Sequence, residues 1–263
     1  TRRSSDLVGS SRRVWVTIRE TLVLLCIAIG LTPAFKMKFW NIGAEGQILM
    51  GGMATAALMI YAGDAMPNWL LLILIFIASA AAGLIWGLIP AVFKEYFNTN
   101  ETLFTLMLNY VAMQLVTFAI VFWENPSGSN TVGIINAAGQ KGWFPSIFGN
   151  MYGLNVIVVL IITFGMYVYM KYSKQGYEIA VVGESQNTAR YAGINVKKVI
   201  IRTMMLSGAI CGIAGCLIVS GASHTISTST AGGRGFTAII VAWMSEFNPF
   251  AMILVSAFLV FMQ

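Results

Sequence analysis

Long apolar runs, separated by short polar breaks, constrain the fold of this chain more than any other feature of its sequence. The longest runs cover residues 69–93, 103–123 and 152–170. A helix needs about 20 apolar residues to cross the roughly 30 Å hydrocarbon layer of a bilayer, so each of these runs can span it. Only 10% of the residues are charged, whereas ordinary globular domains contain roughly 25%. The chain is therefore predicted to be an integral membrane protein.

The runs are continuous, whereas the strands of an outer-membrane barrel alternate apolar and polar residues. The sequence therefore predicts an all-α, polytopic helical membrane protein in which residues 1–263 form one transmembrane domain. A chain of this length accommodates about seven spans. Several of them are expected to be short or broken, because the other apolar runs cover only residues 21–35, 48–62, 203–221, 236–245 and 250–262.

The distribution of basic residues predicts the orientation in the membrane. Cytoplasmic loops carry an excess of lysine and arginine. Residues 124–150 contain only Lys141, so this segment is predicted to be an external loop. Residues 171–202 form the most basic stretch and are predicted to be a cytoplasmic loop, because they carry Lys171, Lys174, Arg190, Lys197, Lys198 and Arg202.

Residues 1–20 form an arginine-rich arm that is predicted to be an amphipathic interfacial helix or an extracytoplasmic segment. Alternation of the spans places this arm outside, which conflicts with its five arginines, Arg2, Arg3, Arg12, Arg13 and Arg19. A missing upstream helix would resolve the conflict, as would a segment 36–47 that re-enters without crossing. The chain starts at Thr1 and stops at Gln263 after a short run, so helices are expected to be missing at one or both ends.

Residues 41–47 place a carboxylate, two amides and two glycines between two apolar runs. A carboxylate at the bilayer centre costs roughly 2.5 kcal/mol or more, and such residues face a protein interior or an aqueous cavity. Residues 232–246 resemble this stretch in kind, because glycines precede a short apolar segment that ends in Glu246. Paired interrupted segments mark the permeation path of many transporters. A structural role in close helix packing is the alternative, and the two roles are compatible.

Residues 184–195 predict a short helix on the cytoplasmic side. Ser185 can cap its start, and Gly193 can end it in the left-handed conformation. Ala189, Tyr191 and Ala192 are expected to be exposed on it. No span requires this helix, so it suits docking to a soluble partner, and a solvated connector is the alternative.

Three blocks of the sequence resemble the permease subunit of bacterial ATP-binding-cassette importers, in the branch for nucleosides and simple sugars. These blocks are residues 39–47 (FWNIGAEGQ), residues 100–110 (NETLFTLMLNY), and residues 189–195 (ARYAGIN) with residues 235–239 (GFTAI) downstream. The resemblance implies a multi-pass protein of the bacterial plasma membrane. It also implies a full subunit of about ten helices, more than this chain contains.

The resemblance further implies the partners. They are a separate ATPase subunit, a second permease subunit (identical or homologous), an extracytoplasmic substrate-binding lipoprotein received by residues 124–150, and the lipid bilayer. Residues 184–195 resemble the coupling helix that docks on the ATPase, with contacts expected from Glu184, Ser185, Asn187, Arg190, Tyr191 and Gly193. For a neutral, hydroxyl-rich solute, amides and aromatic rings suit the path. Its candidate lining residues are Asn41, Glu45, Gln47, Asn109 and Phe236. For Glu45, the alternative role is a structural hydrogen-bond acceptor for neighbouring backbone amides.

No catalytic role is predicted for the chain itself. The sequence lacks a Gly-x-x-x-x-Gly-Lys-Ser/Thr phosphate loop, so ATP hydrolysis is assigned to a partner subunit. No metal, cofactor or nucleic-acid site is predicted. An ion-coupled secondary transporter or channel is the alternative function, and it would require intramembrane carboxylates, for which only Glu45 and Glu246 are available. An intramembrane enzyme would need a nucleophile–base pair, and the single histidine, His224, has no evident partner.

Overall fold

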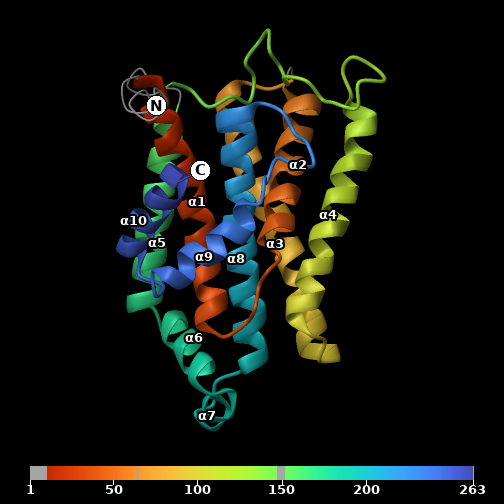
Figure 1. Ribbon diagram of the computed structural model, residues 1–263. Coiled ribbons are helices and arrows are strands. Elements are labelled where there is room, and N and C mark those ends of the chain that lie inside the picture. Colours follow the sequence, from red (N-terminus) through yellow and green to blue (C-terminus); the bar gives the residue numbers. More distant parts are fainter. Residues whose placement is uncertain (1–10, 64, 147–151, 263) are drawn as a thin grey trace.

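The computed structural model describes residues 11–63, 65–146 and 152–262, and these residues form an all-helical bundle without strands (Figure 1). The polytopic all-α prediction is confirmed. The helices are α1 (Ser11–Lys36), α2 (Ala44–Ala62), α3 (Asn68–Phe97), α4 (Glu101–Trp123), α5 (Gly153–Tyr172), α6 (Lys174–Glu184), α7 (Gln186–Tyr191), α8 (Val196–Ile218), α9 (Arg234–Met244) and α10 (Pro249–Met262). A π-helical turn, η1 (Val219–Ser223), extends α8.

Within the described residues, five helical segments are long and apolar enough to cross a membrane. Helix α2 adds 19 residues, and the shorter α9 and α10 contribute 11 and 14 residues. Long, short and broken elements therefore occur together, as expected for a chain of about seven spans. The five long segments are Val14–Lys36, Asn68–Phe97, Glu101–Trp123, Gly153–Tyr172 and Val196–Ser223.

Two helices extend further than the apolar runs predict. Helix α1 already begins at Ser11, so residues 11–20 form its first turns, while residues 1–10 lie outside the described part of the chain. Helix α3 continues through residues 94–97, beyond the apolar run that ends at residue 93. Asn98 ends it in the left-handed conformation, with φ of 52°. The charges at this helix end are accommodated because Lys94 forms an ion pair with Glu101 at 2.8 Å.

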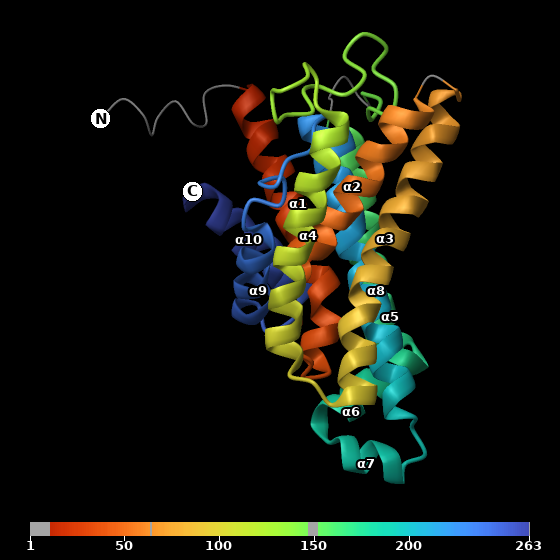
Figure 2. The same cartoon turned by 90° about the vertical axis from the view of Figure 1, so that its right-hand side faces the viewer.

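Helix α8 forms the centre of the bundle and packs against α1, α2 and α3. Of the 18 most apolar consecutive residues in the segment Val196–Ser223, 78% are buried inside the protein, compared with 17% for those of α5. Figures 1 and 2 place α6 and α7 at one end of the bundle and residues 124–146 at the other. The predicted cytoplasmic and external segments therefore lie at opposite ends of the bundle.

Glycines allow α8 to approach its neighbours closely. A methyl group added at Gly212 would overlap the carbonyl oxygen of Ser79, and one at Gly208 would overlap that of Gly83. On the α2 side, a methyl at Gly215 would overlap the carbonyl oxygen of Ile48. Small residues at such crossings favour helix association in lipid, where burial of apolar surface gives no driving force.

We predict that Gly212→Ala destabilises the protein, because the α3–α8 backbones must separate to admit the methyl group. Overpacking of this kind costs about 1–3 kcal/mol. Thermal unfolding of the purified protein should show a lower midpoint for this variant. Gly165→Ala in α5 is the matched control, because nothing lies within 4 Å of its added methyl. Equal midpoints for the two variants would contradict the role of the α3–α8 contact.

Candidate functional site

The connection between α1 and α2 turns back into the bundle, so α2 begins inside it and not at its end (Figure 1). Helix α9 runs obliquely across the long helices at a similar depth (Figure 1). The start of α2 therefore meets the start of α9 within the bundle. We call this meeting point, formed by residues 41–47 and 232–236, the polar junction.

The carboxylate of Glu45 joins the two helices at the polar junction. Its Oε1 accepts a hydrogen bond from the Gly233 amide at 2.7 Å, and its Oε2 accepts one from the Gly235 amide at 2.8 Å. Gly233 adopts a left-handed conformation, with φ of 77°, directly before α9. A carboxylate is stabilised at a helix N-terminus by the unpaired amides and the helix dipole. Glu45 thus supplies the cap that α9 lacks in its own sequence.

Asn109 of α4 holds the other side of the junction. Its Oδ1 accepts from the Gly46 amide at 2.9 Å, while its Nδ2 donates to the Ile42 carbonyl at 3.0 Å. Asn41 accepts from the Gly43 amide at 3.0 Å through its own Oδ1. These bonds satisfy backbone groups that a helix beginning inside a membrane would otherwise leave unpaired.

Gln47 and Trp86 each have one buried polar atom at the junction without a hydrogen-bond partner among the described residues. Gln47 is 1% exposed, and its Nε2 reaches Asn41 Oδ1 at 3.5 Å. Neither Gln47 Oε1 nor Trp86 Nε1 has a hydrogen-bond partner among the described residues. A buried acceptor and a buried donor of this kind are costly without partners, and water or a polar ligand can satisfy them.

An ion pair ties α9 to α1. Arg234 donates through Nε and Nη2 to Glu20 Oε2, at 3.0 and 2.7 Å, and Arg19 also pairs with Glu20. The start of α9 is therefore held by two carboxylates, Glu20 through the Arg234 side chain and Glu45 through the backbone. Nothing in the sequence spacing of Glu20 and Arg234 predicts that they pair.

An aromatic surface borders the junction. Phe236 is 41% exposed on α9, one residue after Gly235. Trp40 and Trp243 stack on each other with ring centroids 5.4 Å apart, and both are nearly half exposed. Because Trp40 directly precedes Asn41 in the sequence, it could have been predicted to lie beside the junction. No feature of the sequence indicated that Trp243 stacks on it.

The five residues expected to line the path do not share one environment. The structure brings Asn41, Glu45, Gln47 and Asn109 together in the buried part of the junction. It places Phe236 on the exposed face of α9. Asn41, Glu45 and Asn109 hydrogen-bond backbone groups, whereas Gln47 reaches only the side chain of Asn41. The ring of Phe236 is accessible.

Residues 184–195 fold as the sequence predicts at both ends of the short helix. Ser185 Oγ accepts from the Thr188 amide at 3.2 Å, and Gly193 is left-handed with φ of 77°. Tyr191 is 93% exposed. Glu184, Asn187, Arg190 and Gly193 are also exposed, while Ser185 is half-buried.

The expected exposure of Ala189 is wrong, because this residue is fully buried. It belongs to an apolar cluster, the coupling cluster, that packs α7 against α6, α8 and the α1–α2 connection. Figure 1 shows α7 at the far end of the bundle, with its other side unpartnered. The coupling cluster consists of Ala34, Met37, Phe39, Ala91, Ile179, Val182, Ala189, Val196, Val199, Ile200 and Met204.

Helices long and apolar enough to cross a membrane, together with two helices that begin inside the bundle, are typical of membrane transport proteins. The chain belongs to the family described as the permease component of branched-chain amino acid transport systems, which matches residues 16–263. It is thus a non-catalytic, multi-pass permease component of an ABC transporter in the bacterial plasma membrane, with ATP hydrolysis in a separate subunit. An ion-coupled transporter and an intramembrane enzyme are thereby set aside.

Individual relatives support the same class. The chain is 30% identical over 258 residues to the guanosine ABC transporter permease protein NupP of Bacillus subtilis, covering 97% of this chain and 74% of that protein. It is 26% identical over 255 residues to the nucleoside ABC transporter permease protein NupB of Lactococcus lactis, covering 94% and 70%. It is 30% identical over 237 residues to the glucose ABC transporter permease protein TsgB13 of Haloferax volcanii, covering 86% and 61%.

We predict that Glu45→Gln lowers the thermal midpoint, because a glutamine can accept from only one of the two glycine amides. The other amide then faces an NH2 group, and an unsatisfied buried donor costs about 1–3 kcal/mol. Glu184→Gln is the control, because it removes the same charge from an exposed residue. If both variants melt like the unaltered protein, the Glu45 cap does not stabilise the junction.

Proposed function

We propose that this permease forms the membrane path for a nucleoside or a simple sugar in an ATP-driven importer. The observation that carries the proposal is the polar junction, where Glu45 joins two helices that begin inside the bundle. Interrupted helices with polar backbone near the middle of the membrane are the usual binding elements of transporters. Relatives named for guanosine, nucleoside and glucose transport favour these two solute classes.

The proposed path lining comprises Asn41, Glu45, Gln47, Asn109 and Phe236. In this proposal the four polar residues shape the junction, and Gln47 Oε1 keeps a free acceptor among the described residues. Phe236 offers an exposed ring. A neutral solute with many hydroxyl groups is suited by a few oriented polar groups beside aromatic surface. Both oxygens of the Glu45 carboxylate already accept hydrogen bonds from the Gly233 and Gly235 amides.

Residues 184–195 are proposed to dock on the ATPase subunit. The coupling cluster beneath α7 contains Ala189, and it also contains Met37 and Phe39 of the α1–α2 connection. Packed apolar groups move together because interiors are dense and resist compression. A displacement of α7 would therefore reach the connection that leads directly into the polar junction. This continuous packing gives a physical route from ATP-driven closure of a partner to a rigid-body change at the path.

The remaining partners are a second permease subunit and an extracytoplasmic substrate-binding lipoprotein, which residues 124–150 are proposed to receive. A second guanosine ABC transporter permease protein of Bacillus subtilis, NupQ, is also similar to this chain, at 23% identity over 267 residues. The second permease subunit is proposed to be either identical or homologous to this chain.

We predict that replacing both Arg190 and Tyr191 by alanine uncouples the ATPase without unfolding the permease, because both side chains are exposed. Truncation of a tyrosine at the centre of an interface costs about 2 kcal/mol or more, which corresponds to a loss of more than about tenfold in affinity. The measurement is ATPase activity in proteoliposomes with the partner subunits, stimulated by nucleosides or by simple sugars.

Tyr177→Ala is the matched control, since Tyr177 is 68% exposed on α6 but lies outside residues 184–195. Stimulation should survive in the control and fall in the double variant. Stimulation that is unchanged in the double variant would exclude the docking role. If the unaltered complex takes up neither nucleosides nor sugars when ATP is supplied, the proposed substrate classes are excluded.

A further inference from the structure

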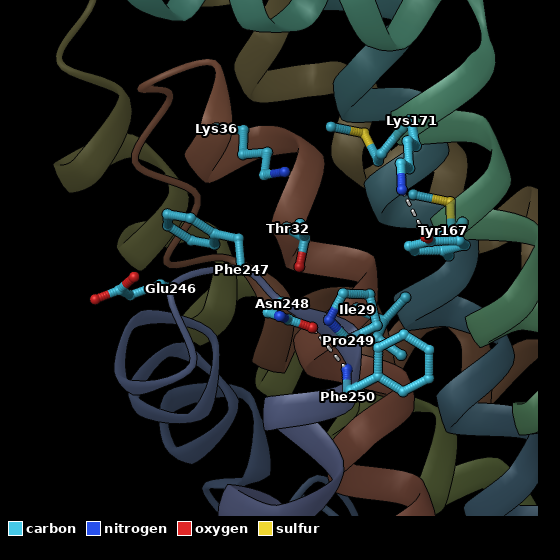
Figure 3. A pocket seen from close by; sticks show the side chains of 12 residues that line it. Ile29, Thr32, Lys36, Tyr167, Lys171, Glu246, Phe247, Asn248, Pro249 and Phe250 are labelled. Carbon is cyan, nitrogen blue, oxygen red and sulfur yellow. Dashed lines mark hydrogen bonds between the residues drawn. The ribbon is translucent and has the colours of Figure 1, made fainter.

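A cavity of about 570 Å³ opens between α1, α5 and the turn that joins α9 to α10 (Figure 3). Its volume lies within the range of about 300–1,000 Å³ that is typical of small-molecule sites. The C-terminal ends of α1 and α5, which lie near α6, form two sides of the cavity. These ends lie on the predicted cytoplasmic side, well away from the outer segment 124–146.

Two lysines stand at one edge of the cavity. Lys36 is the last residue of α1, and Lys171 lies in the last turn of α5. Lys171 Nζ donates to the Tyr167 hydroxyl at 3.0 Å and lies 5.5 Å from the centre of the Tyr172 ring. Within the described residues, neither lysine forms an ion pair with a carboxylate. The edge therefore carries two positive charges that are not neutralised by the protein.

One carboxylate also borders the cavity, that of Glu246 in the α9–α10 turn. Figure 3 shows it on the side of Phe247, pointing away from both lysines. The positive and negative groups are thus segregated around the opening, and the lysine edge retains its cationic character.

The remaining wall of the cavity is mostly apolar. Ile29 and Phe250 lie further from the lysines in Figure 3, and Met166 and Met170 of α5 also contribute. The cavity therefore presents cations at its edge and an apolar surface deeper along the helices. A phospholipid has the same distribution, with its phosphate at the interface and its chains in the hydrocarbon layer. Basic pockets between helices on the cytoplasmic side are suited to anionic head groups.

We propose that this cavity binds an anionic phospholipid of the cytoplasmic leaflet, with its phosphate between Lys36 and Lys171 and one acyl chain along Ile29, Met166 and Phe250. A lipid is favoured over a small soluble anion, because a small anion would leave the apolar wall in contact with water. The proposal depends on the predicted orientation of the bundle and not on the identity of the transported solute.

The test is native mass spectrometry of the purified transporter complex titrated with phosphatidylglycerol or phosphatidylcholine. The double variant Lys36→Gln and Lys171→Gln should bind phosphatidylglycerol about tenfold more weakly, because each lysine near the membrane surface contributes several-fold to anionic lipid binding. Its binding of phosphatidylcholine should not change. The double variant Lys36→Arg and Lys171→Arg should keep its affinity for phosphatidylglycerol, which separates loss of charge from loss of folding.

The matched control is the pair Lys38→Gln and Lys174→Gln, which removes the same charge from exposed residues at the same end of the protein but outside the cavity. The control should bind phosphatidylglycerol like the unaltered complex. Equal losses in both glutamine pairs, or no preference for phosphatidylglycerol in the unaltered complex, would overturn the proposal. Equally tight binding of inorganic phosphate would assign the lysines to a soluble anion. A complex that excludes lipid from the cavity would assign it to a protein segment.

Discussion

The two hydrogen bonds from the amides of Gly233 and Gly235 to the Glu45 carboxylate are the interaction on which the rest of this structure depends. They join residues 188 and 190 positions apart in the chain. Without them, α9 would begin inside the membrane with unpaired amides, and α2 would carry an unpartnered carboxylate in its first turn. Each of these groups is costly alone in an apolar medium, and each satisfies the other here.

The packing around this junction explains how a broken helix can be stable. Asn109 pairs the backbone at the start of α2, and Glu20 holds α9 through Arg234. The glycine contacts of α8 pack it closely against α2 and α3, which supports the α2 side of the junction. From the opposite end, the coupling cluster connects Ala189 of α7 with Met37 and Phe39 before the junction. One continuous set of contacts therefore links the exposed helix at one end to the interrupted helices within the bundle.

Much of the fold could be predicted because bilayer thickness and hydropathy largely determine where spans lie. The ends of α2 at Ala62 and of α4 at Trp123 coincide with the ends of apolar runs. The start of α1 could not be predicted in this way, because its basic first turns resemble an interfacial segment. Ala189 was placed on the wrong face, since a six-residue helix carries too few positions to define an apolar side.

The site was predictable in kind but not in its contacts. The glycines and carboxylate of residues 41–47, and their likeness to residues 232–246, pointed to a pair of interrupted segments. The partners of Glu45 and Arg234 depend on tertiary packing between distant parts of the chain, for which the sequence contains no local signal. Glu45 could therefore be singled out from the sequence, with an acceptor role for backbone amides as one alternative, but the α9 amides could not be named as its partners. Trp243, which stacks on Trp40, carries no sequence signal.

The most direct test of a solute path at the junction is the reaction of Phe236→Cys with a membrane-impermeant maleimide in the reconstituted transporter. Native background is low, because Cys26, Cys211 and Cys216 are all 0% exposed. A solute path at the junction predicts labelling that the transported solute slows, and no labelling of Ile161→Cys, a position 66% exposed in the middle of α5. A solute path at the junction is contradicted if Phe236→Cys is as unreactive as Ile161→Cys. It is also contradicted if Phe236→Cys reacts at a rate that does not depend on solute.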